Sequence, residues 1–253
     1  MRGLGIDDLR GFLRDDLRQK MDFSKTDQSR GLPAPPIEKP IPEGNPETID
    51  LPDFTSLISR REVLLFEAIN NRRSHRVYKR LPINLEELSL LLYSTSGIQK
   101  VINPAVALRT VPSAGCRHAL ETYLCALNVK GLQQAIYRYL PLSHRLLKVK
   151  ESDSLRGLIV EATLGQSFTG NAAVVFIWTT IPYRMEWRYG IASHKVIALD
   201  AGHVCQNLYL SAHMVDCGVC AIAAYDQDKM DNLIDVDGKE EFTIYLAALG
   251  KIR

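Results

Sequence analysis

The sequence predicts an α+β fold, with a central antiparallel or mixed sheet flanked by helices and an N-terminal extended arm. Strand-like apolar runs and helical segments intermix along residues 56–253, as expected for several helices packed on one short sheet. Prolines crowd residues 33–52, which predicts extended chain before that region. We therefore divide the chain into an N-terminal helix and proline-rich arm, residues 1–55, and one domain, residues 56–253.

Composition narrows the class of protein. The chain has 253 residues, 46% hydrophobic and 24% charged, which is ordinary for a soluble globular protein. The net charge of +2 gives no sign of a nucleic-acid partner. No apolar run reaches the ~18 residues of a membrane span, and residues 1–20 lack the apolar core of a signal peptide. Five cysteines, an odd number, suit a reducing compartment. We expect a cytoplasmic protein.

The arm begins with a helical pattern that places Ile6, Leu9, Leu13 and Leu17 on one face. Residues 22–52 follow, with too many prolines for a continuous helix. They are expected to lie over the surface of this chain or of a partner subunit. A flexible tail is the alternative.

In residues 56–253, the spacing of apolar residues and the helix-capping residues predict the helices and strands. Asn84 and Gly97 are expected to begin and end a helix over residues 85–93. The run 172–178 lacks alternation and predicts a strand buried on both faces. Residues 194–215, apolar nearly all round, predict a buried central helix. The other expected helices are 59–69, 154–164 and 229–234, and the other strands are 120–129, 135–140, 219–224 and 242–249.

A basic cluster with a hydroxyl follows the expected helix 59–69. Arg72, Arg73, Ser74 and Arg76 would suit an anion with several oxygens, because guanidinium grips phosphate bidentately. A solvated helix end is the plainer interpretation, since cations also favour the negative pole of a helix.

These residues resemble the R-R-S-x-R opening of the nitroreductase family of FMN enzymes. Segments 108–115 (LRTVPSAG) and 199–207 (LDAGHVCQN) resemble the SagB-type dehydrogenase branch, which includes oxidases of thiazoline and oxazoline peptides. Residues 249–253 (LGKIR) are similar to the basic tail of that family. The resemblance covers roughly residues 60–253 and implies a nitroreductase-like fold that binds FMN, commonly as a homodimer with the flavin at the subunit boundary.

The resemblance also implies which residues hold the flavin. Arg72 and Arg76 would take the phosphate, Ser74 the ribityl or phosphate oxygens, and Lys251 and Arg253 would join from the C-terminus. Arg73 is expected to be exposed.

A second implied set lies near the flavin ring. Pro112, Ser113, Ala114 and Gly115 form a turn on any interpretation, and their small size lets backbone approach a flat ligand. Arg109 is a candidate donor to the pyrimidine edge or the phosphate. Ala223 and Ala224 end the segment 221–224, which matches the family segment facing flavin N5.

The implied activity is two-electron, ping-pong hydride transfer at flavin N5 by an FMN-dependent oxidoreductase, acting on a small molecule or a peptide. One alternative is an NAD(P)H-dependent nitro or quinone reductase. Another is a non-catalytic flavin-binding or scaffold protein of a biosynthetic complex. Azoline-oxidising relatives carry a lysine-tyrosine pair before the D-A-G-H helix, and here Arg188 and Tyr189 stand there. Arginine cannot act as a base at ordinary pH, so Tyr189 is the expected acid or base and Arg188 a fixed cation.

Cys217 and Cys220 form a C-x-x-C pair, which could be redox-active or half a zinc site. No second ligand pair stands at a compatible spacing, so we expect structural cysteines and no metal site.

Overall fold

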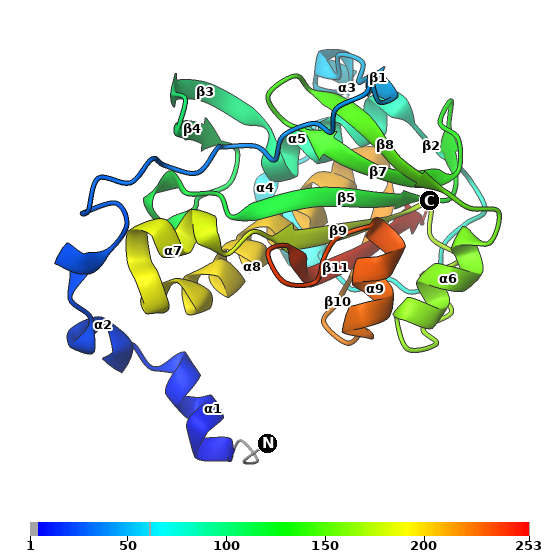
Figure 1. Ribbon diagram of the computed structural model, residues 1–253. Coiled ribbons are helices and arrows are strands. Elements are labelled where there is room, and N and C mark those ends of the chain that lie inside the picture. The colour runs from blue at the N-terminus through cyan, green and yellow to red at the C-terminus, as the bar shows by residue number, and fades with distance from the viewer. Residues whose placement is uncertain (1–4, 61, 253) are drawn as a thin grey trace.

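A seven-stranded sheet forms the centre of the protein, with strand order β1-β8-β7-β5-β9-β11-β10 (Figure 1). Every neighbouring pair in this sheet is antiparallel. This computed structural model describes residues 5–60 and 62–252. It confirms the predicted α+β class. The strands are β1 (Thr48–Asp50), β5 (Leu120–Ala126), β7 (Ala135–Leu140), β8 (Arg145–Glu151), β9 (Val174–Thr180), β10 (Cys217–Ile222) and β11 (Phe242–Lys251).

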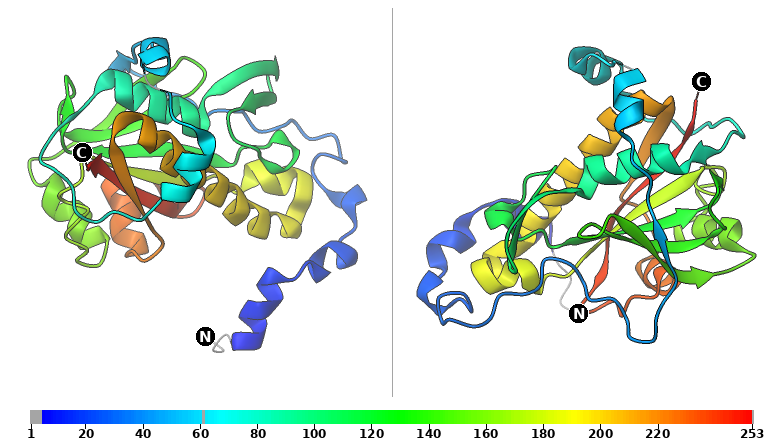
Figure 2. Two further views of the ribbon diagram at one scale, coloured as in Figure 1. Left: turned by 180° about the vertical axis from the view of Figure 1, so that it is seen from behind. Right: turned by 90° about the horizontal axis from the view of Figure 1, so that it is seen from above.

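Helices cover both faces of the sheet (Figure 2). Residues of α5 (Leu85–Ser96) and α8 (Ser193–Ser211) share one core cluster with one face of the strands. Residues of α6 (Leu155–Ala162) and α9 (Gln227–Ile234) share the second cluster with the opposite face. Every residue of β5 and β9 is buried as a result. This explains why the run at 172–178 does not alternate between apolar and polar residues.

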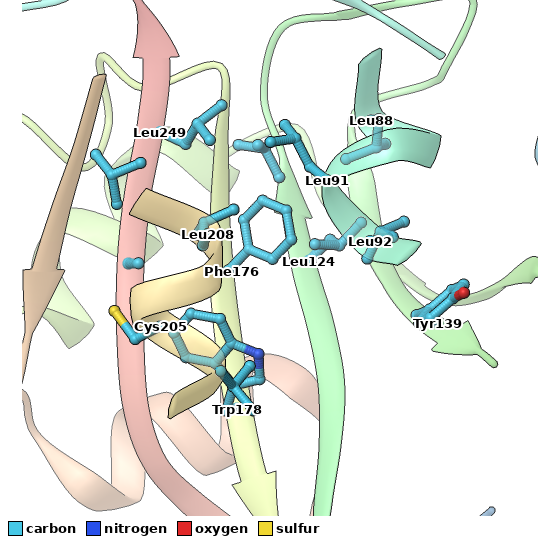
Figure 3. Packing of buried hydrophobic residues seen from close by; sticks show 14 of the residues in the cluster. Leu88, Leu91, Leu92, Leu124, Tyr139, Phe176, Trp178, Cys205, Leu208 and Leu249 are labelled. Atoms are coloured by element: carbon cyan, nitrogen blue, oxygen red, sulfur yellow. The ribbon is translucent and has the colours of Figure 1, made fainter. Parts of the chain in front are cut away.

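The first core cluster sits between α5, α8 and the central strands (Figure 3). Leu91 of α5, Phe176 of β9 and Leu208 of α8 are fully buried there. The cap of α5 confirms the prediction. Asn84 Oδ1 accepts from Glu87 N at 2.8 Å, and Glu87 Oε2 accepts from Asn84 N at 2.9 Å. Such a reciprocal cap satisfies two backbone donors that the helix leaves free.

The arm carries α1 (Ile6–Leu13), α2 (Asp16–Lys20) and the 3-10 turn η1 (Phe23–Lys25), and α1 projects from the body (Figure 1). No residue of α1 is buried, so the predicted apolar face of this helix lies exposed. Further along, the arm runs over its own chain. Trp187 Nε1 donates to Leu32 O at 3.0 Å, and β1 pairs with β8 at the sheet edge.

Two predicted helices differ from the structure. One helix is expected over residues 59–69, but this range overlaps the end of α3 (Thr55–Arg60) and most of α4 (Leu65–Asn71). Leu64, just before α4, has extended backbone with φ −65° and ψ 129°. The stretch 194–215 forms α8 followed by the 3-10 turn η4 (Ala212–Val215). It is not buried all round, since Leu199 of α8 is 56% exposed.

Several short elements carry weak sequence signals and were not predicted. The β3–β4 hairpin is mostly exposed, so burial imposes no apolar pattern on it. Helix α7 starts at Pro182 without a side-chain cap. The elements are α7 (Tyr183–Tyr189), β2 (Ile83–Asn84), β3 (Ile98–Asn103), β4 (Val106–Arg109), β6 (Val129–Lys130), η2 (Ala114–Cys116) and η3 (Gly190–Ala192). None of the helices within the described residues is long and apolar enough to cross a membrane.

Candidate functional site

The predicted basic stretch lies along the edge of the sheet. His75 N donates to Val219 O at 2.9 Å, and Ser74 forms an isolated parallel bridge with Val219 of β10. The backbone after α4 therefore adds to the edge strand instead of ending free in solvent. This docking orients the side chains on either side of Ser74.

Tyr209 of α8 joins three segments at this edge. Its hydroxyl oxygen lies 2.9 Å from Ser74 Oγ and accepts from Ala221 N at 2.9 Å. The guanidinium carbon of Arg72 lies 5.3 Å from the centre of the Tyr209 ring, a cation–π distance. We call Arg72, Ser74, Tyr209 and Ala221 the edge cluster. Sequence reasoning missed Tyr209, because nothing in a helical pattern shows which strand a tyrosine hydroxyl will reach.

The segment expected to face flavin N5 leaves this cluster directly. Ala223 and Ala224 follow β10, and both are exposed. Gln166 Nε2 donates to Ala224 O at 2.9 Å and so holds the backbone there. Ala223 stands two residues after Ala221 of the edge cluster in the chain.

Other predicted phosphate-binding residues have partners of their own. Lys251 Nζ donates to Glu87 Oε1 at 2.5 Å and to Val215 O at 2.7 Å. The Arg73 guanidinium donates to Asn70 O at 3.0 Å, so it caps α4 near the basic stretch. Arg253 lies outside the described residues.

Arg76 is separated from the edge cluster. Its guanidinium carbon lies 5.9 Å from the centre of the Phe168 ring, and Phe168 packs against the second core cluster. Tyr209 belongs to the first core cluster, on the other side of the sheet. The structure therefore places Arg72 and Ser74 on one face and Arg76 on the other.

The predicted turn lies against the predicted catalytic pair. Gly115 has a φ of +59°, and a Cβ built there would lie 2.6 Å from Tyr189 Oη and 2.8 Å from Arg188 Nε. Only glycine fits this close approach at a positive φ. The Arg188 guanidinium donates to Gln28 Oε1 of the arm at 3.3 Å.

Asp200 of α8 lies beside this turn. Burial raises the pKa of its carboxyl group, and the nearby Ser113 hydroxyl and Ala114 N–H oppose that rise. We call Ser113, Ala114, Gly115, Tyr189 and Asp200 the turn cluster. In the sequence, Asp200 is simply the first residue of the D-A-G-H motif. Its position beside the turn could be recognised only in the folded structure.

Arg109 lies behind the turn, buried, and donates to Ile37 O of the arm at 2.5 Å. Burial lowers the pKa of its guanidinium to about 10, against the opposing attraction of Glu121. Its Nε has no hydrogen-bond partner among the described residues. This position does not support the expected donation from Arg109 to a flavin, because the turn and the arm cover it. Pro112 lies exposed at the start of the turn.

The two clusters sit at different places along one helix. Asp200 and Tyr209 are nine residues apart on α8, which corresponds to about 14 Å at the rise of an α-helix. Each cluster contains part of the predicted site, and the helix fixes the distance between the two clusters.

The C-x-x-C pair is split by the strand that carries it. Cys217 packs in the first core cluster, whereas the Cys220 thiol lies near Arg76 on the opposite face of β10. Residues three apart on a strand point to opposite faces, so the thiols cannot share a metal or form a disulfide. Burial raises the pKa of the Cys217 thiol to about 12. No group of three or more His, Cys, Asp or Glu side chains in the described part of the chain could hold a metal ion.

Comparison with known proteins identifies the family of the chain. The sequence profile of the nitroreductase family matches residues 69–251. The chain belongs to the nitroreductase family. The nitroreductase-like protein MJ1384 of Methanocaldococcus jannaschii is 28% identical over 208 residues, covering 82% of this chain and 98% of MJ1384.

Relatives named for the processing of trifolitoxin support the SagB-type branch. The trifolitoxin-processing protein TfxB of Rhizobium leguminosarum bv. trifolii is 24% identical over 163 residues, covering 61% of this chain and 44% of TfxB. The chain thus spans less than half the length of TfxB. A chain of the Escherichia coli microcin synthetase complex McbBCD, solved with truncated pro-MccB17, has the same fold with a TM-score of 0.61 at 16% identity. That match covers 100% of this chain and 99% of the other.

A further solved structure contains a flavin. A nitroreductase-like protein from Desulfovibrio desulfuricans, in complex with FMN, matches with a TM-score of 0.51 at 16% identity. The match covers 75% of this chain and 87% of that one. The nitroreductase fold predicted from the sequence is thereby confirmed.

His118, beside the turn cluster, gives a prediction about pH. Burial, and then the charge of Arg109, lowers the pKa of its imidazole to about 3. The unfolded chain therefore binds a proton between pH 6.5 and about 3 that the folded chain does not. Stability should fall as the pH drops through this window, with a slope of at most about 1.4 kcal/mol per pH unit from this group.

The test compares wild type with His118→Asn in urea unfolding at pH 7 and pH 4.5. Asparagine tolerates the φ of +45° at this position. We expect the variant to lose less stability on acidification than the wild type. Equal losses in both proteins would show that His118 does not titrate in this range.

Proposed function

We propose that the protein is an FMN-dependent oxidoreductase of the SagB type that transfers two electrons in a ping-pong reaction. The observation that carries this proposal is the edge cluster, where Tyr209 contacts Arg72, Ser74 and Ala221, shortly before the exposed residues Ala223 and Ala224. The family match over residues 69–251 supports it.

The edge cluster fits the phosphate end of FMN. Arg72 is partly buried, and no carboxylate among residues 5–60 and 62–252 pairs with it, so its charge is available to an anion. Guanidinium can grip a phosphate of about −2 charge bidentately, and the Ser74 hydroxyl adds a short donor. Lys251 lies at the end of the neighbouring strand, where it is paired with Glu87. We assign Lys251 a supporting role there, with Arg253 beyond it.

Bound FMN would supply reversible two-electron hydride chemistry, which no side chain can provide. The protein's own residues would position the flavin and the substrate and would stabilise negative charge. Tyr209 fixes the backbone of β10 at Ala221 through its hydroxyl. The alanines at 223 and 224 leave that end of the strand open to a flat ring and a substrate, since they have no bulk beyond Cβ.

We propose that two copies of the chain complete each site. The edge and turn clusters of one chain stand about 14 Å apart along α8, so the turn cluster of a second copy would face the edge cluster of the first. An apolar face supports this arrangement. Phe66 on α4 is 75% exposed and Leu199 on α8 is 56% exposed, and the two helices contact each other. Large exposed apolar surfaces mark protein interfaces.

In this site Tyr189 is the proposed acid or base, and Arg188 is a cation that stabilises negative charge on the substrate. The Arg188 guanidinium carbon lies 5.5 Å from the centre of the Tyr189 ring, so the two groups act in one place. The substrate is a small molecule or a peptide. Similarity to peptide-processing proteins favours a peptide.

A second candidate is an NAD(P)H-dependent nitro or quinone reductase, favoured by the similarity to almost the whole length of MJ1384. A flavin-binding subunit without its own turnover is favoured by the likeness to a chain of a synthetase complex. Flavin reduction by NAD(P)H followed by turnover with a quinone would identify the reductase. Tightly bound FMN with no turnover of either substrate class would identify the binding subunit.

The first prediction concerns the cofactor. The purified protein should be yellow and release FMN on denaturation. Arg72→Ala should weaken FMN binding by about 1.5–3 kcal/mol, the range for losing a hydrogen bond between charged groups. Fluorescence titration of FMN into the apoprotein measures this change.

Arg73→Ala is the matched control, because its guanidinium caps α4 and should leave the flavin affinity within a factor of two or so. A colourless protein that takes up no FMN would refute the proposed function. Equal losses in both variants would refute the assignment of the edge cluster.

The second prediction concerns assembly. Phe66→Glu should shift the protein from dimer to monomer at micromolar concentration and reduce its FMN content, because it places a charge in the proposed interface. Sedimentation velocity measures the oligomeric state. Ile102→Glu on the β3–β4 hairpin, also an exposed apolar residue, is the control and should remain dimeric. A flavin-loaded wild-type monomer would contradict the shared site.

The third prediction concerns Arg188. Arginine cannot release its proton near neutral pH as a desolvated lysine can, so we expect low oxidation of azoline-containing peptides by the wild type. Arg188→Lys should raise that rate, and Tyr189→Phe should lower it in both backgrounds. Mass spectrometry of the peptide, which loses 2 Da on oxidation of each azoline, follows the reaction. Rapid oxidation by the wild type that lysine does not improve would overturn this assignment.

A further inference from the structure

A second basic cleft lies away from the edge cluster. It has a volume of about 570 Å³, within the range of small-molecule sites. Its polar lining consists of Arg76, Tyr78, Arg80, Asn128, Arg156 and Asn171. Its lining residues come from the loop between α4 and α5, from Asn128 after β5, from α6 and from the loop before β9.

The cleft opens on the opposite side of the sheet from Tyr209. After His75 the chain leaves the edge strand and passes over the glycines of β10 and β11. A Cβ at Gly218 would lie 2.7 Å from the His75 side chain, and one at Gly250 would lie 2.8 Å from the Tyr78 ring. Tyr78 packs against the second core cluster, whereas Tyr209 belongs to the first. This crossing carries Arg76 and Arg80 away from Arg72.

The described part of the chain does not compensate the charges in this cleft. None of the described residues that line it is acidic. Arg156 is held by backbone carbonyls, donating to Gly170 O at 2.5 Å and to Leu127 O at 2.8 Å, which fix the guanidinium without cancelling its charge. Arg76 stacks near the Phe168 ring. For neither Arg76 nor Arg80 does the described chain supply an ion-pair partner.

We propose that this cleft binds an organic diphosphate of the nucleoside diphosphate class. Arg76, Arg80 and Arg156 line one cleft without a carboxylate among its described residues, which matches a ligand with two or more negative charges. The volume exceeds what a diphosphate alone requires, and the carboxamides of Asn128 and Asn171 provide donors and acceptors for the ribose or base. The proposal goes beyond the flavin site, since it needs neither FMN nor a second subunit.

The probe is ADP, titrated calorimetrically into the full chain at low and moderate salt. We expect saturable one-to-one binding that weakens as salt rises. Arg80→Ala should weaken it about tenfold or more, through loss of a charge-assisted hydrogen bond. Asn171→Leu should weaken ADP binding more than it weakens binding of inorganic pyrophosphate, because the amide is assigned to the nucleoside. Lys100→Ala on the exposed β3 is the matched control and should bind ADP like the wild type.

Circular dichroism and the FMN content verify that each variant is folded. Arg80 is exposed and lies on a loop, so its replacement should leave the core intact. Absence of ADP binding to the wild type would overturn the proposal. Equal affinity of wild type and Arg80→Ala would overturn it too. Displacement of FMN by ADP, or loss of ADP binding in Arg72→Ala, would show that ADP occupies the edge cluster instead. Failure of FMN binding alone would refute the proposed flavin site and leave this cleft supported.

Discussion

The fold depends on the compensation of one buried carboxylate. Glu121 stands in the central strand β5 with a side chain only 2% exposed, and Arg184 Nη2 of α7 donates to it at 2.6 Å. Lys39 N of the arm donates to the same oxygen at 2.8 Å. A buried charge that loses its partner costs about 3–5 kcal/mol, so α7 and the arm must both stay where Glu121 holds them. That requirement positions Arg188 and Tyr189 at the end of α7.

Helix α8 extends this constraint across the molecule. It packs on the sheet through residues such as Leu208. Asp200 of the turn cluster and Tyr209 of the edge cluster lie at different points of this one helix. A helix cannot shorten to bring them together. This fixed separation is the reason why we propose that a second copy of the chain completes the site, and Leu199 on the same helix is exposed.

Hydrogen bonds to buried arginines hold the arm on the domain, and the sequence did not indicate which residues would make them. Its carbonyl groups accept from arginines buried in the domain, with Arg138 Nη2 donating to Pro40 O at 3.0 Å and Arg109 to Ile37 O. Prolines suit this role because they keep the chain extended and leave carbonyls free to accept. From composition alone, a flexible tail and an ordered strap are equivalent, since the difference lies in partners far along the chain.

The sequence by itself determined the local features whose causes are local. Residues close together in the chain were enough to predict three features: the helix cap at Asn84, the strand at 172–178 that is buried on both faces, and the sequence motifs of the family. Only the tertiary structure decided which side chains meet. The family resemblance implied that Arg72, Ser74 and Arg76 bind the same end of FMN. The pairing at Ser74 is an isolated bridge, and the chain then crosses the sheet edge, so the third residue of this set reaches the opposite side. Contacts of this kind depend on where the chain turns in space, which residue spacing does not encode.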